Sequence, residues 1–157
     1  MIIARRILFA TAALPHAATA TEEPTLEVRG LIGPPTPRRL SLSQLDAMGL
    51  SDLETRTPWT VGPQHFSGLP MRLLLQAVGA QGHMLRGVAL NDYAVDMPLA
   101  ELLASDAFLA THLDSAPIPV RLRGPFWIVF PWSRRPELES AIHRQRSIWQ
   151  LHRIDIA

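Results

Sequence analysis

Alternating apolar and polar residues predict several β-strands along the chain. Residues 26–31 and 147–156 both alternate, which is typical of strands with one buried face. Residues 125–131 are apolar at nearly every position, which indicates a strand buried on both faces. Weaker patterns predict further strands at residues 51–59, 87–90 and 107–113.

Three short helices are predicted between these strands. Residues 40–48 have Ser41 or Ser43 as a possible N-cap and Gly49 as a stop. Residues 66–80 have a proline that suits a first turn and a glycine that ends the helix, and residues 97–104 open near another proline. Arg144 and Arg146, with Glu137 and Glu139, resemble a solvated helix face. Strands mixed with short helices, without a uniform strand–helix repeat, favour an α+β fold with a mixed β-sheet core.

Composition limits the chemistry that this fold can carry. The chain has 157 residues, of which 47% are hydrophobic and 18% charged, and this suits one domain with a real core. All 15 basic residues are arginine and the net charge is +1, so nucleic-acid binding is disfavoured. The absence of cysteine excludes disulfides, zinc–thiolate sites and thiol nucleophiles.

The first 20 residues have the features of a signal peptide. Arg5 and Arg6 precede an apolar run, and Ala18 and Ala20 supply small residues at the spacing of a cleavage site. We expect residues 1–20 to be removed near Ala20, leaving a single domain of residues 21–157 that is periplasmic or secreted. A membrane anchor is disfavoured because Pro15 interrupts the run early, so the mature form is not expected to span a membrane. Export by the twin-arginine or the general route stays open.

Tyr93, the only tyrosine in the chain, is the first candidate site residue. Its hydroxyl could face a pocket with Asn91, or it could be a half-buried ring beside an ordinary Asn-Asp turn. His65 could bind an anion together with Arg56 and Arg72, because guanidinium groups match phosphate and sulfate bidentately. A solvated histidine with two exposed arginines is an equal alternative.

Four segments, in this order, resemble the molybdopterin-binding domain of the sulfite-oxidase type. They are residues 66–75 (Phe-Ser-Gly-Leu-Pro-Met-Arg-Leu-Leu-Leu), 90–98 (Leu-Asn-Asp-Tyr-Ala-Val-Asp-Met-Pro), 108–119 (Phe-Leu-Ala-Thr-His-Leu-Asp-Ser-Ala-Pro-Ile-Pro) and 123–131 (Arg-Gly-Pro-Phe-Trp-Ile-Val-Phe-Pro). The resemblance covers residues 26–156. It implies a sulfite-oxidase-type fold with Tyr93 facing the pocket, and molybdopterin as a possible cofactor.

One departure from that family bears directly on function. The family holds molybdenum through a cysteine on the strand before the residue 66–75 segment, and in this chain that strand has Thr55 and Thr57 but no cysteine. A hydroxyl is a hard, barely acidic ligand that does not replace a soft thiolate. Bound molybdenum and sulfite oxidation are therefore disfavoured.

Three hypotheses follow from the sequence. The favoured one is an exported, non-catalytic domain that binds a small anionic ligand, or a membrane sensor partner, through the Tyr93 pocket. The second is a molybdopterin-dependent oxidoreductase with a non-cysteine metal ligand. The third is a structural or interaction domain without a ligand.

Overall fold

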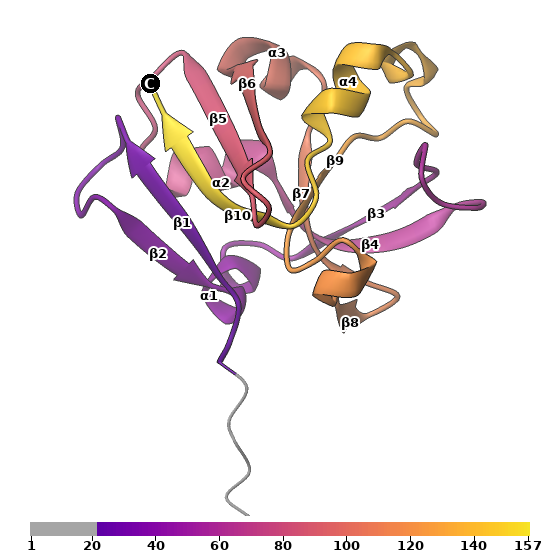
Figure 1. The fold of residues 1–157 in the computed structure, drawn as a ribbon, viewed down its shortest axis with the longest axis horizontal. Coiled ribbons are helices and arrows are strands. Elements are labelled where there is room, and N and C mark those ends of the chain that lie inside the picture. The colour runs from indigo at the N-terminus through magenta and orange to yellow at the C-terminus, as the bar shows by residue number, and fades with distance from the viewer. Residues whose placement is uncertain (1–21) are drawn as a thin grey trace, which may run out of the picture.

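Two β-sheets and four short α-helices make up residues 22–157, the part of the chain that this computed structural model describes (Figure 1). The predicted signal peptide, residues 1–20, lies outside the described residues. No helix in residues 22–157 is long and apolar enough to cross a membrane.

The first sheet joins the beginning and the end of the described chain. Its strand order is β2-β1-β10-β5-β6, and its one parallel pair is β1 with β10. The strands are β1 (Thr25–Gly30), β2 (Arg38–Ser41), β5 (Met84–Ala89), β6 (Ala94–Pro98) and β10 (Leu151–Ile156). The presence of parallel and antiparallel pairs in one sheet confirms the expected mixed β-sheet.

The second sheet is built around β4 and β7, which lie antiparallel. Its order is β3-β4-β7-β8, and β9 also pairs with β7. The strands are β3 (Ser51–Thr55), β4 (Gln64–Pro70), β7 (Phe108–Leu113), β8 (Ala116–Pro117) and β9 (Trp127–Val129). Gly68 is needed here because a Cβ at this position would collide with the backbone carbonyl of Leu109.

The helices are short, and three of them follow directly on a strand (Figure 1). They are α1 (Leu42–Ala47), α2 (Met71–Ala77), α3 (Leu99–Ala104) and α4 (Ala141–Arg146), with 3₁₀ turns η1 (Val120–Leu122) and η2 (Pro136–Leu138). Ser41 is the N-cap of α1, where its hydroxyl accepts the Gln44 N–H while the Gln44 side chain accepts the Ser41 N–H. One of the two candidate caps is thereby confirmed.

Several predicted boundaries were wrong. Residues 66–70 are the last five residues of β4 rather than helix, because their backbone pairs with β7 and, at residues 66–68, also with β3. Residues 97–98 end β6 instead of opening α3. The closing strand begins at Leu151, since Gln150 has a positive φ of 51° that breaks the strand. Arg146 is 6% exposed, so the predicted solvated helix face does not include it.

The core lies where the apolar runs predicted it. Phe126 and Trp127 are 0% and 1% exposed, which confirms a strand buried on both faces. Trp127 Nε1–H donates to Ser147 Oγ at 3.0 Å, and that hydroxyl donates to the Ile128 carbonyl at 2.7 Å. The buried polar atoms around β9 are therefore satisfied.

Candidate functional site

Tyr93 lies in the tight turn that joins β5 to β6. The Ala89 N–H donates to the Tyr93 carbonyl at 2.8 Å, and the Tyr93 N–H donates to Asn91 Oδ1 at 3.2 Å. Asp92 has a φ of 65°, which aspartate tolerates in turns. Asp92 therefore has the turn role that its sequence context favoured, and the Asn91 side chain also supports the turn. The Tyr93 side chain is about half exposed.

A cavity of about 240 Å³ lies against this turn. Four parts of the chain form it: the turn itself, the end of α4, the segment that follows α4, and the loop after β3. Its lining is Trp59, Ala89, Asn91, Tyr93, Arg144, Gln145, Ser147, Ile148 and Trp149. Two of the predicted site residues, Asn91 and Tyr93, thus share one cavity.

Two indole rings form a fixed wall of this cavity. Trp59 and Trp149 meet edge to face, with ring centroids 5.0 Å apart and planes at 81°. The Arg123 guanidinium lies 5.4 Å from the Trp149 ring and 5.5 Å from the ring of Trp127. Its Nη2 also donates to the Trp59 carbonyl at 3.4 Å. These contacts hold the wall in place without a ligand.

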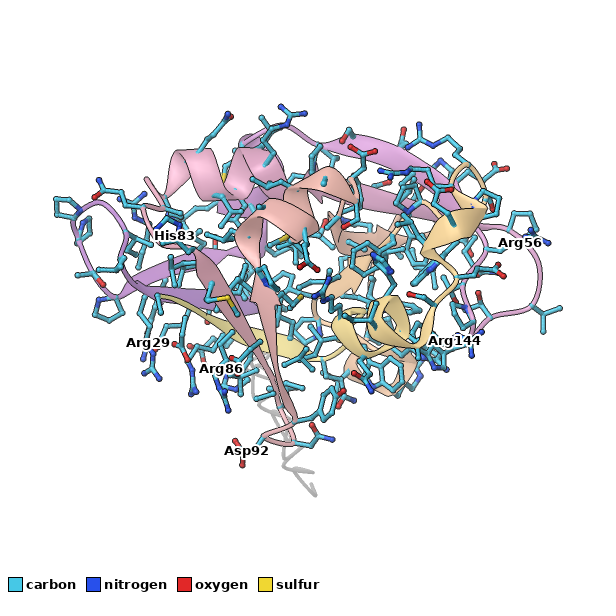
Figure 2. All side chains as sticks on the ribbon, turned by 90° about the horizontal axis from the view of Figure 1, so that it is seen from above. Arg29, Arg56, His83, Arg86, Asp92 and Arg144 are labelled. Atoms are coloured by element: carbon cyan, nitrogen blue, oxygen red, sulfur yellow. The ribbon has the colours of Figure 1, made fainter. Side chains whose placement is uncertain are left out.

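A second cavity of about 320 Å³ shares Arg144 with the first. Its lining is Arg56, Thr57, Pro58, Thr60, Glu139 and Arg144. Within residues 22–157 neither Arg56 nor Arg144 forms an ion pair, and both are exposed. Figure 2 labels the two arginines at the same end of the molecule, away from Arg29 and His83. The combined site therefore has an aromatic part and a cationic part, with one carboxylate, Glu139, on the cationic side.

Helix α4 places Arg144 at the junction of the two cavities. Ser140 is the N-cap of the helix, and its hydroxyl accepts the His143 N–H. Arg146, at its other end, pairs with Glu101 of α3 at 2.7 Å. The His143 ring packs edge-on against Phe130 at 5.1 Å, and burial lowers the pKa of His143, with Arg146 and Arg135 adding to the effect. Contacts on several sides therefore fix the helix.

The remaining predicted residues lie elsewhere. Arg72 lines a third cavity, and His65 lies beside Asp52, with His65 Nε2 and Asp52 Oδ1 3.9 Å apart. The structure does not bring Arg56, His65 and Arg72 together as one anion site. Arg56 and Arg72 line different cavities, and His65, which lies opposite Glu54 of β3, lines none of the three.

Sequence reasoning missed Trp59, Trp149 and Arg144 as site residues. All four tryptophans of the chain lie in one cluster, with Trp59 in contact with Trp127, Trp132 and Trp149. Their scarcity was a signal, but the segments that carry them are far apart in the sequence. No local pattern could have paired them.

Thr55 and Thr57 do not fit a molybdenum centre of the cysteine-ligated kind. The Thr55 side chain is 0% exposed, and its hydroxyl donates to the Arg56 carbonyl and accepts the Ser133 N–H. The Thr57 hydroxyl shares a 2.8 Å hydrogen bond with Thr60 and accepts the Trp59 N–H. Both hydroxyls are engaged within the protein, and neither is a soft donor.

Comparison with known proteins supports the fold. No protein-family model and no curated protein matches the chain. The sulfane dehydrogenase SoxCD of Paracoccus pantotrophus superposes on 85% of this chain with a TM-score of 0.61, at 14% sequence identity. The match covers 38% of the SoxCD chain, so this chain spans well under half of that structure. At this identity the likeness shows the fold alone, and the chain has a sulfite-oxidase-like fold.

Proposed function

We propose that this chain is an exported, non-catalytic binding module that holds a small organic anion beside Tyr93. The observation that carries the proposal is the position of Arg144, which lines both the aromatic cavity and the cationic one. A ligand with a flat apolar part and one anionic group would fill both cavities at once.

The two parts of the site suit the two parts of such a ligand. The indole rings of Trp59 and Trp149 offer apolar surface to a flat group, and the Tyr93 hydroxyl can hydrogen-bond at its edge. Arg144 and Arg56 offer guanidinium forks that match a carboxylate, sulfate or phosphate. Glu139 would repel a second anionic group, which favours ligands with a single one.

The lining residues support binding rather than catalysis. No histidine lines either cavity, and the Ser147 hydroxyl is already used by Trp127 and the Ile128 carbonyl. Without a base beside it, this serine is not an activated nucleophile. The proposal of export depends on the predicted signal peptide. Export would expose the module to ligands outside the cytoplasm. The partner that we propose there is a membrane sensor protein.

The test is native mass spectrometry of the protein purified from its own cell envelope, with each bound small molecule then identified. We expect retained organic anions in the wild-type protein. With the identified compound, Arg144→Gln should raise the Kd about tenfold or more, because one charge-assisted contact is lost. Tyr93→Phe should weaken binding while leaving the melting temperature nearly unchanged.

Arg86→Gln is the matched control, since Arg86 is exposed on β5 and pairs with Asp96 away from both cavities. Wild-type protein that retains no small molecule would contradict the proposal, as would an unchanged Kd in Arg144→Gln. Stoichiometric molybdenum in the same preparation would instead support the oxidoreductase alternative.

A further inference from the structure

A cleft of about 450 Å³ shares no lining residue with the site beside Tyr93. It runs along one end of the second sheet, between β3, the first turn of α2, the end of α3 and the loop before η2. Its lining is Ser51, Asp52, Leu53, Pro70, Arg72, Leu103, Asp106, Ala107, Phe108, Arg134 and Arg135.

Residues of β3 form one side of the cleft. This strand is the end strand of its sheet and pairs only with β4 in the described chain. Alternate N–H and C=O groups of an end strand point away from the sheet and are ready to pair with another strand. Three successive residues of β3, Ser51 to Leu53, line the cleft. The cleft therefore offers an extended backbone those N–H and C=O groups of Ser51 to Leu53 that do not face β4.

The arginines of the cleft differ in how their charges are balanced. Arg135 contacts Asp106 at 3.0 Å and Glu137 at 2.8 Å, and it also donates to the Ala104 carbonyl at 2.7 Å. By contrast, the side chains of Arg72 and Arg134 make no ion pair or hydrogen bond to any other residue of the described chain, and both are exposed. The cleft therefore has two arginines without an ion pair in the described chain, Arg72 and Arg134. Of its two carboxylates, Asp106 is paired with Arg135, and Asp52 lies on β3.

The loop that carries Arg134 is fixed to β3. The Ser133 N–H donates to Thr55 Oγ1 at 3.0 Å, and Ser133 Oγ accepts the Arg56 N–H at 2.8 Å. Leu103, which is 39% exposed, and Phe108 add apolar surface to the same cleft. Backbone groups, cationic side chains and apolar surface are therefore held side by side.

We propose that this cleft binds an extended, acidic segment of a partner protein, which adds a strand to the edge of β3. The main chain of the segment pairs with β3 around Asp52, and its carboxylates bind Arg72 and Arg134. A small inorganic anion would use the two arginines but leave the strand edge unpaired. This inference is independent of ligand binding beside Tyr93.

The probe is a short, capped peptide of alternating valine and glutamate, added to ¹⁵N-labelled protein and followed by NMR. We expect saturable shifts of the Ser51, Asp52 and Leu53 amides and slower hydrogen exchange at this edge. Arg72→Glu and Arg134→Glu should each raise the Kd about tenfold or more, because attraction becomes repulsion. Arg121→Glu, on η1 and absent from the cleft lining, is the control and should leave the Kd unchanged.

Two further probes separate the alternatives. A peptide of alternating valine and lysine, and the glutamate peptide with methylated backbone nitrogens, should both fail to bind. The proposal is overturned if the glutamate peptide shifts none of the three amides, or if the methylated peptide binds equally well. It is also overturned if inorganic phosphate saturates Arg72 and Arg134 while the peptide does not bind.

Discussion

His143 shows how one side chain links the packing of α4 to pH. Its Nδ1 lies 2.8 Å from the Ser140 hydroxyl, and its ring is edge-on to Phe130. Burial is the largest cause of its lowered pKa, the positive charges of Arg146 and Arg135 lower it further, and Glu101 opposes them. The fold therefore favours neutral His143.

The lowered pKa of His143 makes the free energy of unfolding decrease in acid. The unfolded chain takes up a proton at this histidine near pH 6.5, and the folded chain does so only at a lower pH. The contribution of His143 is therefore fully present above pH 6.5 and is lost as the pH falls through the folded-state pKa. Urea unfolding of the wild type and of His143→Gln should be measured across this pH range. The free energy of unfolding should fall less in the variant as the pH is lowered.

His83→Gln, which changes an exposed histidine, is the control for that comparison. Equal pH dependence in wild type and His143→Gln would show that other groups control the acid response.

The residue scale also shows what the sequence could predict. The Asn91–Tyr93 turn, the Ser41 cap and the burial of Trp127 depend on neighbours in the chain or on an uninterrupted apolar run, so local patterns predicted them. Arg56 and Arg144 line one cavity and Arg72 lines another, and this grouping depends on how distant strands pair. Single residue types carry no information about that pairing.

Among the elements, β9 is buried at each of its three residues. Trp127 packs edge to face with Phe66, with ring centroids 5.4 Å apart, and its indole N–H is hydrogen-bonded to Ser147. Trp127→Ala should therefore cost about 3–5 kcal/mol of the free energy of unfolding, from lost burial and the cavity left behind. Chemical denaturation measures this cost.

Val61→Ala is the matched control, because Val61 is 97% exposed. If Trp127→Ala unfolds at the wild-type denaturant midpoint, β9 is not part of the cooperative core.

An ion pair between Arg146 and Glu101 holds α4 on α3. The Arg146 side chain is 7% exposed and pairs with Glu101, whose own side chain is 58% exposed. Glu101→Gln would leave Arg146 buried without a full charge partner, at a cost of about 1–3 kcal/mol in thermal or chemical unfolding. The same variant should weaken ligand binding beside Tyr93, because α4 also carries Arg144.

Glu137→Gln breaks an ion pair with the more exposed Arg135 and is the comparison, with a smaller expected cost because solvent screens this pair. Equal costs for the two substitutions would mean that the Arg146–Glu101 pair does not anchor α4.

At the scale of the whole molecule, the sequence predicted the α+β class and the mixed sheet better than the element boundaries. Strand periodicity and the four-segment resemblance both extend over most of the described chain, so small errors do not change the class. The helix expected at residues 66–80 was wrong in its first part, because pairing with β3 and β7 determines the structure of residues 66–70. The likeness to SoxCD supports the fold but leaves the activity of this chain open to the experiments above.

The position of β10 has a consequence for folding. It lies in the middle of the first sheet, between β1 and β5, although it follows both in the chain. During synthesis, β1 and β5 are made long before the strand that separates them. The sheet therefore cannot close until residues 151–156 are available, and contacts between such distant segments form slowly. Until then, the edges of β1 and β5 stay exposed to chaperones and proteases.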